Sequence, residues 1–81
     1  MIIKVLGPGC PKCKVLYNQV LRVEKDLSRQ DEIIKVEDYQ HMMAYNILST
    51  PALVIDEKVL CSGRIASTDE IKKWIKEREN L

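Results

Sequence analysis

The chain has 81 residues, 46% of them hydrophobic and 31% charged, and a formal net charge of +1 at pH 7. This composition is ordinary for a single globular domain, which we expect to span residues 1–81, and it argues against a disordered or fibrous protein. A net charge near zero and an aromatic content of 5% also argue against binding to nucleic acid or to an anionic membrane surface.

The first predicted elements are a strand, a turn and a helix. The apolar run at residues 2–6 is typical of a buried strand, and the Gly-Pro-Gly sequence at residues 7–9 predicts a sharp turn. Pro11 then occupies the first helical position if Cys10 is the N-cap, because a proline loses no hydrogen bond there. The helix extends to about Ser28, since apolar residues recur at the spacing of one helix face at Leu16, Val20, Val23 and Leu27.

The middle of the chain predicts a strand, a short helix and a hairpin. Residues 32–37, which read Glu-Ile-Ile-Lys-Val-Glu, indicate a second strand, and a short helix follows over residues 39–45 with Asn46 as its C-cap. Residues 52–55 and 58–61 indicate the two strands of a β-hairpin, although the two residues between them include no glycine.

The last predicted element is a helix with a clear start. Ser67 at the N-cap, Asp69 in the first turn and Glu70 three residues after the cap match a capping box. A helical stripe with a basic end follows at Ile71, Trp74, Ile75 and Arg78. The order β-α-β-α-β-β-α predicts a parallel strand pair and a later antiparallel hairpin. We therefore expect an α/β fold, with a four-stranded mixed sheet and helices on its faces.

The cysteines predict the compartment. No apolar run approaches the roughly 20 residues of a membrane span, and the first residues lack the basic start and small-residue cleavage site of a signal peptide. Three cysteines are an odd number, and Cys10 and Cys13 lie too close together for a secreted disulfide framework. We therefore expect a cytoplasmic protein, where such a pair is more often catalytic or metal-binding than structural.

The sequence Cys10-Pro11-Lys12-Cys13 places two thiols one helical turn apart at the start of a helix. Residues at this spacing lie within the roughly 4.4–6.8 Å Cα separation that a disulfide needs. The unpaired N–H groups and the positive end of the helix dipole favour a thiolate over a thiol. The motif predicts a redox site, with binding of a soft metal by the two thiolates as the alternative.

Two further segments strengthen the redox interpretation by resemblance. Thr50-Pro51 precedes the third predicted strand, and residues 63–67 read Gly-Arg-Ile-Ala-Ser before the last helix. With the cysteine motif, they resemble the thioredoxin/glutaredoxin superfamily, in particular its small redox-active disulfide proteins. The resemblance implies a three-layer α/β/α sandwich and a cis peptide bond before Pro51, which would face the disulfide. No tryptophan precedes Cys10, and the glutathione-binding signature of glutaredoxins is not evident near Gly63.

The helix position of the two thiols predicts different roles for them. We expect Cys10, at the exposed tip, to attack a client disulfide and Cys13, one turn deeper, to resolve the mixed disulfide. Lys12 and Lys14 either lower the pKa of the thiol or simply form a solvated first turn. Cys61, within an apolar strand, is interpreted as a small buried hydrophobe.

The remaining site residues are expected to shape the site. The resemblance implies that Pro51 contacts the disulfide and orients the backbone to pair with an extended client, with Thr50 contributing backbone groups. Pro11 shapes the motif, and Gly63 provides close backbone approach or a strand-end turn. We expect no cofactor and no resident metal. The expected partners of a monomer are client protein disulfides and a disulfide reductase as electron donor.

The metal-binding alternative makes a different prediction about topology. Copper-chaperone-like domains also place a Cys-x-x-Cys motif at a loop–helix junction, but their order is β-α-β-β-α-β and they end on a strand. The capped last helix and Thr50-Pro51 favour the redox fold over that arrangement.

Overall fold

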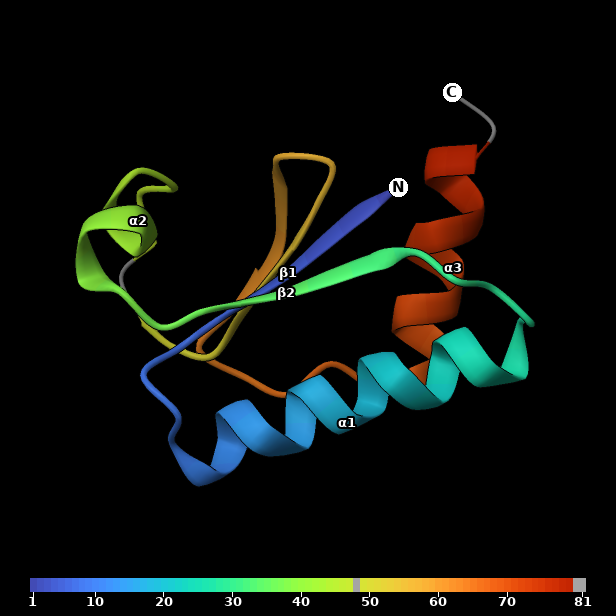
Figure 1. Ribbon diagram of the computed structural model, residues 1–81, viewed down its shortest axis with the longest axis horizontal. Helices are drawn as coiled ribbons and strands as arrows, with labels where there is room; N and C mark the ends of the chain where they lie inside the picture. Colours follow the sequence, from blue (N-terminus) through green and yellow to red (C-terminus); the bar gives the residue numbers. More distant parts are fainter. Residues whose placement is uncertain (48, 80–81) are drawn as a thin grey trace.

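The computed structural model of the chain describes residues 1–47 and 49–79 (Figure 1). The elements follow the predicted order β-α-β-α-β-β-α. They are β1 (Ile2–Leu6), α1 (Pro11–Asp26), β2 (Glu32–Val36), α2 (Tyr39–Met43), β3 (Ala52–Ile55), β4 (Lys58–Ser62) and α3 (Thr68–Glu79). No helix within these described residues is both long enough and apolar enough to cross a membrane.

The four strands form one mixed sheet in the order β2-β1-β3-β4. β1 pairs with β2 in parallel, so that Leu6 lies opposite Val36 at the carboxyl ends of both strands. β3 is antiparallel to β1 and to β4. The sheet is therefore the mixed four-stranded one expected, and the cysteine motif follows the carboxyl end of its central strand β1.

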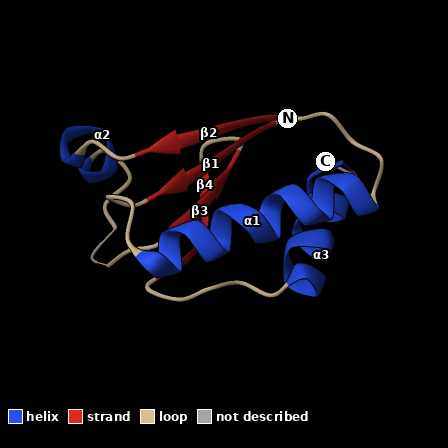
Figure 2. Cartoon of the chain, turned by 60° about the horizontal axis from the view of Figure 1, so that its bottom comes forward, coloured by secondary structure: helices blue, strands red, loops and turns tan. Residues whose placement is uncertain are grey.

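Helices cover the two faces of the sheet unequally (Figure 2). Because side chains alternate along a strand, Ile3 and Val5 of β1 join the larger core, which α1 and α3 cover. Leu6 instead joins a smaller core with Met42 of α2 and Val54 of β3. The result is a three-layer α/β/α sandwich in which α1 and α3 form one layer and the short α2 forms the other.

Two helices end earlier than the sequence predicts. α1 ends at Asp26 rather than near Ser28, because Ser28 has a left-handed backbone (φ 53°) that cannot continue a helix. α2 ends at Met43 with Ala44 as its C-cap, so the prediction of Asn46 as the C-cap is wrong. Asn46 lies two residues beyond the cap, and its N–H donates to the carbonyl of Met43 in a tightened final turn.

The hairpin turn is made without glycine. Asp56 and Glu57 both have positive φ values, 48° and 70°, which are the backbone conformations of a type I′ turn. Glu57 also accepts a hydrogen bond from the Lys4 ammonium at 2.7 Å, and the same ammonium donates to the Tyr45 hydroxyl at 2.6 Å. These contacts tie the turn to β1 and to the chain that follows α2.

The start of α3 is the predicted capping box. The Glu70 N–H donates to the Ser67 hydroxyl, and the Ser67 N–H donates to the Glu70 carboxylate, each at 3.1 Å. Ile71 and Ile75 are then fully buried against the larger core.

Candidate active site

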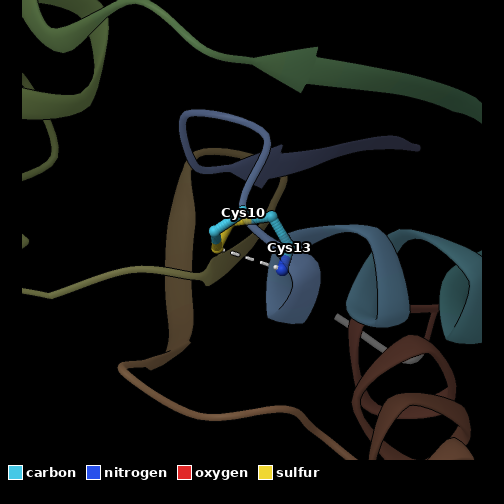
Figure 3. The surroundings of a disulfide bond; sticks show 2 residues. All are labelled: Cys10 and Cys13. Atoms are coloured by element: carbon cyan, nitrogen blue, oxygen red, sulfur yellow. Dashed lines mark hydrogen bonds between the residues drawn. A yellow bond between two sulfur atoms is a disulfide. The ribbon is translucent and has the colours of Figure 1, made fainter.

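Cys10 and Cys13 are joined by a disulfide at the amino end of α1 (Figure 3). Their Cα atoms are 5.1 Å apart, within the usual range for a disulfide. One helical turn therefore brings the two sulfurs together, and the disulfide joins the N-cap residue to the first turn of α1.

Cys10 is the N-cap of α1. Its backbone is extended (φ −67°, ψ 163°), Pro11 occupies the first turn, and the Cys13 N–H donates to the Cys10 sulfur at 3.3 Å (Figure 3). An N-cap side chain normally accepts a hydrogen bond from one of the first N–H groups of its helix. Here a sulfur takes that place, where the free N–H groups and the helix dipole favour negative charge.

The two cysteines differ in accessibility. Cys10 is half-buried, whereas Cys13 is 5% exposed and belongs to the buried part of α1. A partner approaching from solvent can therefore meet Cys10, while Cys13 stays shielded beneath it.

Gly7, at the end of β1, makes room for the disulfide. A Cβ atom placed on Gly7 would overlap the sulfur of Cys13 and would lie 3.8 Å from the Cβ of Thr50. Gly7 thus lies against the Cys13 sulfur, and its missing side chain leaves the space that this sulfur occupies. Sequence reasoning assigned this residue only to a turn. The sequence signal that could have identified Gly7 as a site residue was its position three residues before Cys10, at the end of a buried strand.

Thr50 lies beside this site, and Pro51 follows it in the chain. The peptide bond between them is cis, Pro51 is buried, and its carbonyl accepts a hydrogen bond from the Gly63 N–H at 2.8 Å. Gly63 has a positive φ of 77°, and a Cβ there would overlap the hydroxyl of Ser49. The chain just after β4 is therefore held against the segment before β3 by close backbone approach.

Comparison with known proteins identifies the family. The model of the thioredoxin domain matches residues 1–76. The chain belongs to the thioredoxin family. Together with the Cys10–Cys13 disulfide, this membership gives the protein a general function in thiol–disulfide redox chemistry.

Two archaeal thioredoxins are similar to this member of the family over most of their length. The thioredoxin of Methanocaldococcus jannaschii is 33% identical over 76 residues, which cover 94% of this chain and 87% of the relative. The thioredoxin of Methanothermobacter thermautotrophicus is 30% identical over 73 residues, covering 90% and 95%.

A solved structure supports the thioredoxin-like fold. It is a thioredoxin-2 described as a component of the malaria parasite protein secretion machinery, with a TM-score of 0.70. The match covers 94% of this chain and 81% of that chain at 16% sequence identity, so this likeness concerns the fold alone.

A charged groove of about 80 Å³ adjoins Cys13 on the side of β2. The Lys35 ammonium lies 4.3 Å from the centroid of the Tyr17 ring within it, and Glu37 approaches the loop at Gly9. The full lining comprises Val5, Gly7, Gly9, Cys13, Lys14, Tyr17, Lys35 and Glu37. Lys12 of the cysteine motif is exposed and does not line this groove.

Lys35, Glu37 and Tyr17 are site neighbours that sequence reasoning missed. Parallel pairing places Lys35 opposite Val5, so the end of β2 meets the end of β1 beside the disulfide. The carboxyl ends of parallel strands share one edge of a sheet, and that rule is the signal that could have brought Lys35 and Glu37 into the site.

Cys61, the third cysteine of this family member, is a free thiol in β4. It is 8% exposed within the larger core, and burial raises the pKa of its thiol. A neutral buried thiol agrees with its interpretation as a small hydrophobe.

The geometry of possible metal ligands bears on the alternative function. Within residues 1–47 and 49–79, no group of three or more His, Cys, Asp and Glu side chains is placed to hold a metal ion. The element order β-α-β-α-β-β-α also differs from the β-α-β-β-α-β order of copper-chaperone-like domains from the fourth element on.

Proposed function

We propose that this single-domain protein is a thiol–disulfide oxidoreductase that reduces disulfides of client proteins through a reversible Cys10–Cys13 disulfide. The position of the Cys10 sulfur at the N-cap of α1, accepting from the Cys13 N–H, is the observation that carries the proposal. That position favours the thiolate of Cys10, which is the nucleophile in disulfide exchange. The greater burial of Cys13 supports its role as the resolving thiol.

The reaction takes place in two exchange steps. The Cys10 thiolate attacks one client sulfur, forming a mixed disulfide and releasing the other client sulfur as a thiolate, which then takes up a proton. The Cys13 thiol loses its proton and attacks the Cys10 sulfur, which releases the second client thiol and closes the Cys10–Cys13 disulfide. Two electrons thus pass from the protein to the client, together with one proton from the Cys13 thiol and one proton from solvent. A dithiol of a disulfide reductase returns the electrons by the same two steps in reverse.

The neighbouring residues have positioning roles in this proposal. Pro51 and Thr50 present the client-facing backbone beside the disulfide, and Gly63 supports that segment through its hydrogen bond to the Pro51 carbonyl. Pro11 starts the helix without an unpaired N–H group, and Lys12 adds positive charge to its first turn.

A reducing compartment suits this chemistry. We place the protein in the cytoplasm, where thiol reductants would supply electrons and would keep Cys61 free.

A redox-buffer titration of the protein, with Cys61→Ala as the common background, tests the proposal. The parent should show one two-electron couple, and Cys10→Ser and Cys13→Ser should each lose it. Reaction with a disulfide substrate should trap a mixed disulfide on Cys10 in the Cys13→Ser variant, and none on Cys13 in the Cys10→Ser variant.

The same samples distinguish the competing interpretations. Stoichiometric copper or zinc without a two-electron couple would favour the metal-binding alternative. Faster alkylation of Cys13 than of Cys10 in the reduced protein would reverse the proposed roles of the two thiols.

A further inference from the structure

Glu24, near the end of α1, is a buried acidic side chain with an unpaired oxygen. It is 5% exposed and is the one buried polar or charged residue in the part of the chain that the structure describes. Its Oε1 accepts a hydrogen bond from the Asp31 N–H at 3.0 Å, whereas its buried Oε2 has no hydrogen-bond partner among the described residues. Burial of an ionised carboxylate requires donors for its oxygens, so an ionised Glu24 would be costly here.

Charged groups from other parts of the fold surround Glu24 and its neighbours. Arg29 and Asp31 come from the chain between α1 and β2, which passes alongside α3 (Figure 1). The Met1 ammonium comes from the residue before β1, and Glu79 comes from the end of α3. These five groups are here called the ionic cluster. As described, the cluster contains three carboxyl groups and two cations, so one carboxyl group is in excess of the positive charge.

The two cations of the cluster contact Asp31 and Glu79 rather than the unpaired oxygen of Glu24. Arg29 Nε and Nη2 donate to the two Asp31 oxygens at 2.7 and 3.1 Å, and Arg29 Nη1 pairs with Glu79. The Met1 ammonium lies 3.7 Å from Asp31. Glu24 Oε2 lies 3.9 Å from Arg29 Nε, which is too far for a hydrogen bond. The cations therefore favour an ionised Asp31, and Glu24 is the group that a proton would neutralise.

The pKa values of the two acidic side chains agree with this division. Hydrogen bonds from Arg29 lower the pKa of Asp31. Burial raises the pKa of Glu24 above its ordinary value of 4.5, and a hydrogen bond to the Asp31 side chain and the charge of Asp31 raise it further. A protonated carboxyl group is a hydrogen-bond donor. A proton on Glu24 Oε2 can therefore bond to the Asp31 carboxylate, which removes both the unpaired oxygen and the excess negative charge.

We propose that Glu24 and Asp31 hold one proton between them in the folded protein, carried by Glu24, and that the ionic cluster is a pH-sensitive joint between α1, α3 and the start of β1. Loss of this proton leaves two carboxylates facing each other in a buried site, and their repulsion weakens the joint. In the unfolded chain Glu24 is solvated and ionises at its ordinary pKa, so folding takes up a proton above that pH. The joint lies outside the redox site and is independent of the proposed oxidoreductase function.

The pH dependence of unfolding tests this shared proton. The stability that the proton provides is complete below pH 4.5, the ordinary pKa of Glu24, and is lost as the pH rises to the raised pKa of the folded protein. Each pH unit in this window should raise the unfolding equilibrium constant by up to about tenfold. Urea unfolding of the oxidised protein between about pH 5 and 7 measures the rise, because carboxyl groups with ordinary pKa values are ionised throughout that range.

Two variants identify the group that holds the proton. Glu24→Gln keeps an oxygen that can accept from the Asp31 N–H and supplies an amide donor, but it does not titrate. Its unfolding constant should change by less than about twofold per pH unit. His41→Gln is the control, because histidine side chains ordinarily titrate in this range, and it should keep the slope of the parent. A parent constant that does not rise with pH, or a rise that Glu24→Gln retains, would overturn the inference.

A measurement on the folded parent keeps the inference testable if Glu24→Gln fails to fold. In protein labelled with ¹³C at the side-chain carboxyl groups of glutamate, the Glu24 resonance should titrate with a midpoint above 4.5. Asp31→Asn removes the facing charge and frees the Arg29 guanidinium, so the midpoint of Glu24 should be lower in that variant. A parent midpoint at or below 4.5 would contradict the retained proton. An unchanged midpoint in Asp31→Asn would contradict its sharing with Asp31.

Discussion

Gly7 shapes the site through the side chain that it lacks. The Cys13 sulfur occupies the space into which a Cβ at this position would project. In the disulfide form that sulfur is bonded to Cys10 and cannot turn away, whereas in the dithiol form it is free to adopt another rotamer. A side chain at position 7 should therefore disfavour the oxidised protein more than the reduced one.

We expect Gly7→Ala to make the Cys10–Cys13 couple more oxidising by about 30 mV. Overpacking costs about 1–3 kcal/mol, and about 1.4 kcal/mol corresponds to 30 mV for a two-electron couple. Titration against redox buffers gives the potential. Gly9→Ala is the control, because the strain of its positive φ (88°) is present in both redox forms. Equal potentials for the two variants would contradict the steric role of Gly7.

Among the secondary-structure elements, α3 has the most clearly defined beginning. The Arg64 guanidinium donates to both carboxylate oxygens of Glu70, at 3.0 and 2.7 Å, and the Ser67 N–H donates to the same carboxylate. These hydrogen bonds lower the pKa of Glu70 from its ordinary value of 4.5 to about 2, and those from Arg64 make the largest contribution. The carboxylate that caps the helix thus stays ionised well into acid.

The lowered pKa of Glu70 predicts a pH dependence of stability. A carboxyl group with a lowered folded-state pKa stabilises the protein above its unfolded pKa, and this contribution is lost as the pH falls. The free energy of unfolding should therefore decrease between pH 4.5 and about 2, and Glu70→Gln should show a shallower decrease. Urea unfolding of the parent and of Glu70→Gln at a series of pH values measures both decreases. Glu77→Gln, an exposed change in the same helix, should keep the slope of the parent.

The ends of the elements show what local sequence could predict. The capping box of α3 involves only Ser67 and Glu70, three residues apart, and it was predicted correctly. The end of α2 was not predicted correctly. Asparagine is a common residue at helix ends, but the helix is capped two residues before Asn46, at Ala44. The hairpin turn lacked its usual glycine, yet Asp56 and Glu57 adopt the required left-handed conformations, with Glu57 bonded to Lys4.

Across the whole molecule, the redox site and a buried ionic cluster lie at opposite ends of α1. Arg29 donates to Asp31 at 2.7 and 3.1 Å, lies 3.9 Å from Glu24, and pairs with Glu79 of α3. The side chains of Glu24 and Asp31 are only 7% and 9% exposed. Burial raises the pKa of Glu24, whereas hydrogen bonds from Arg29 lower the pKa of Asp31. This cluster joins α1, the loop before β2 and α3.

We expect Arg29→Met to destabilise the protein by about 2 kcal/mol or more, because it removes the guanidinium beside two buried carboxylates and leaves Asp31 with the more distant N-terminal ammonium at 3.7 Å. The reduction potential should remain unchanged, since Glu24, the cluster residue nearest along α1, lies 11 residues or about 16 Å of helix beyond Cys13. Denaturant unfolding and redox titration measure the two quantities. Lys72→Met removes a more exposed partner of Asp26 and should cost less than about 1 kcal/mol. An equal loss of unfolding free energy in Arg29→Met and Lys72→Met would contradict the stabilising role assigned to the ionic cluster.

The sequence predicted the general arrangement of the fold better than the full surroundings of the site. Element order and the cysteine motif follow from patterns that are local in the chain. The approach of Gly7 to Thr50, and of Lys35 to the groove beside Cys13, depends on sheet pairing between distant segments. Such contacts join distant segments, so Lys35 became a site residue only once the strands were paired, whereas Gly7 had a local signal in its position three residues before Cys10.

The use of Cys10 as an N-cap implies a trade-off between stability and reactivity. A serine hydroxyl is a stronger hydrogen-bond acceptor than a thiol and is among the preferred N-cap groups. We therefore expect that, at an acid pH where Cys10 of the parent dithiol protein is protonated, Cys10→Ser has a free energy of unfolding about 0.5 kcal/mol higher than the parent, while it loses the redox couple. Cys13→Ser buries a hydroxyl and should instead be destabilised. Selection for the strongest helix start alone would have removed the nucleophile.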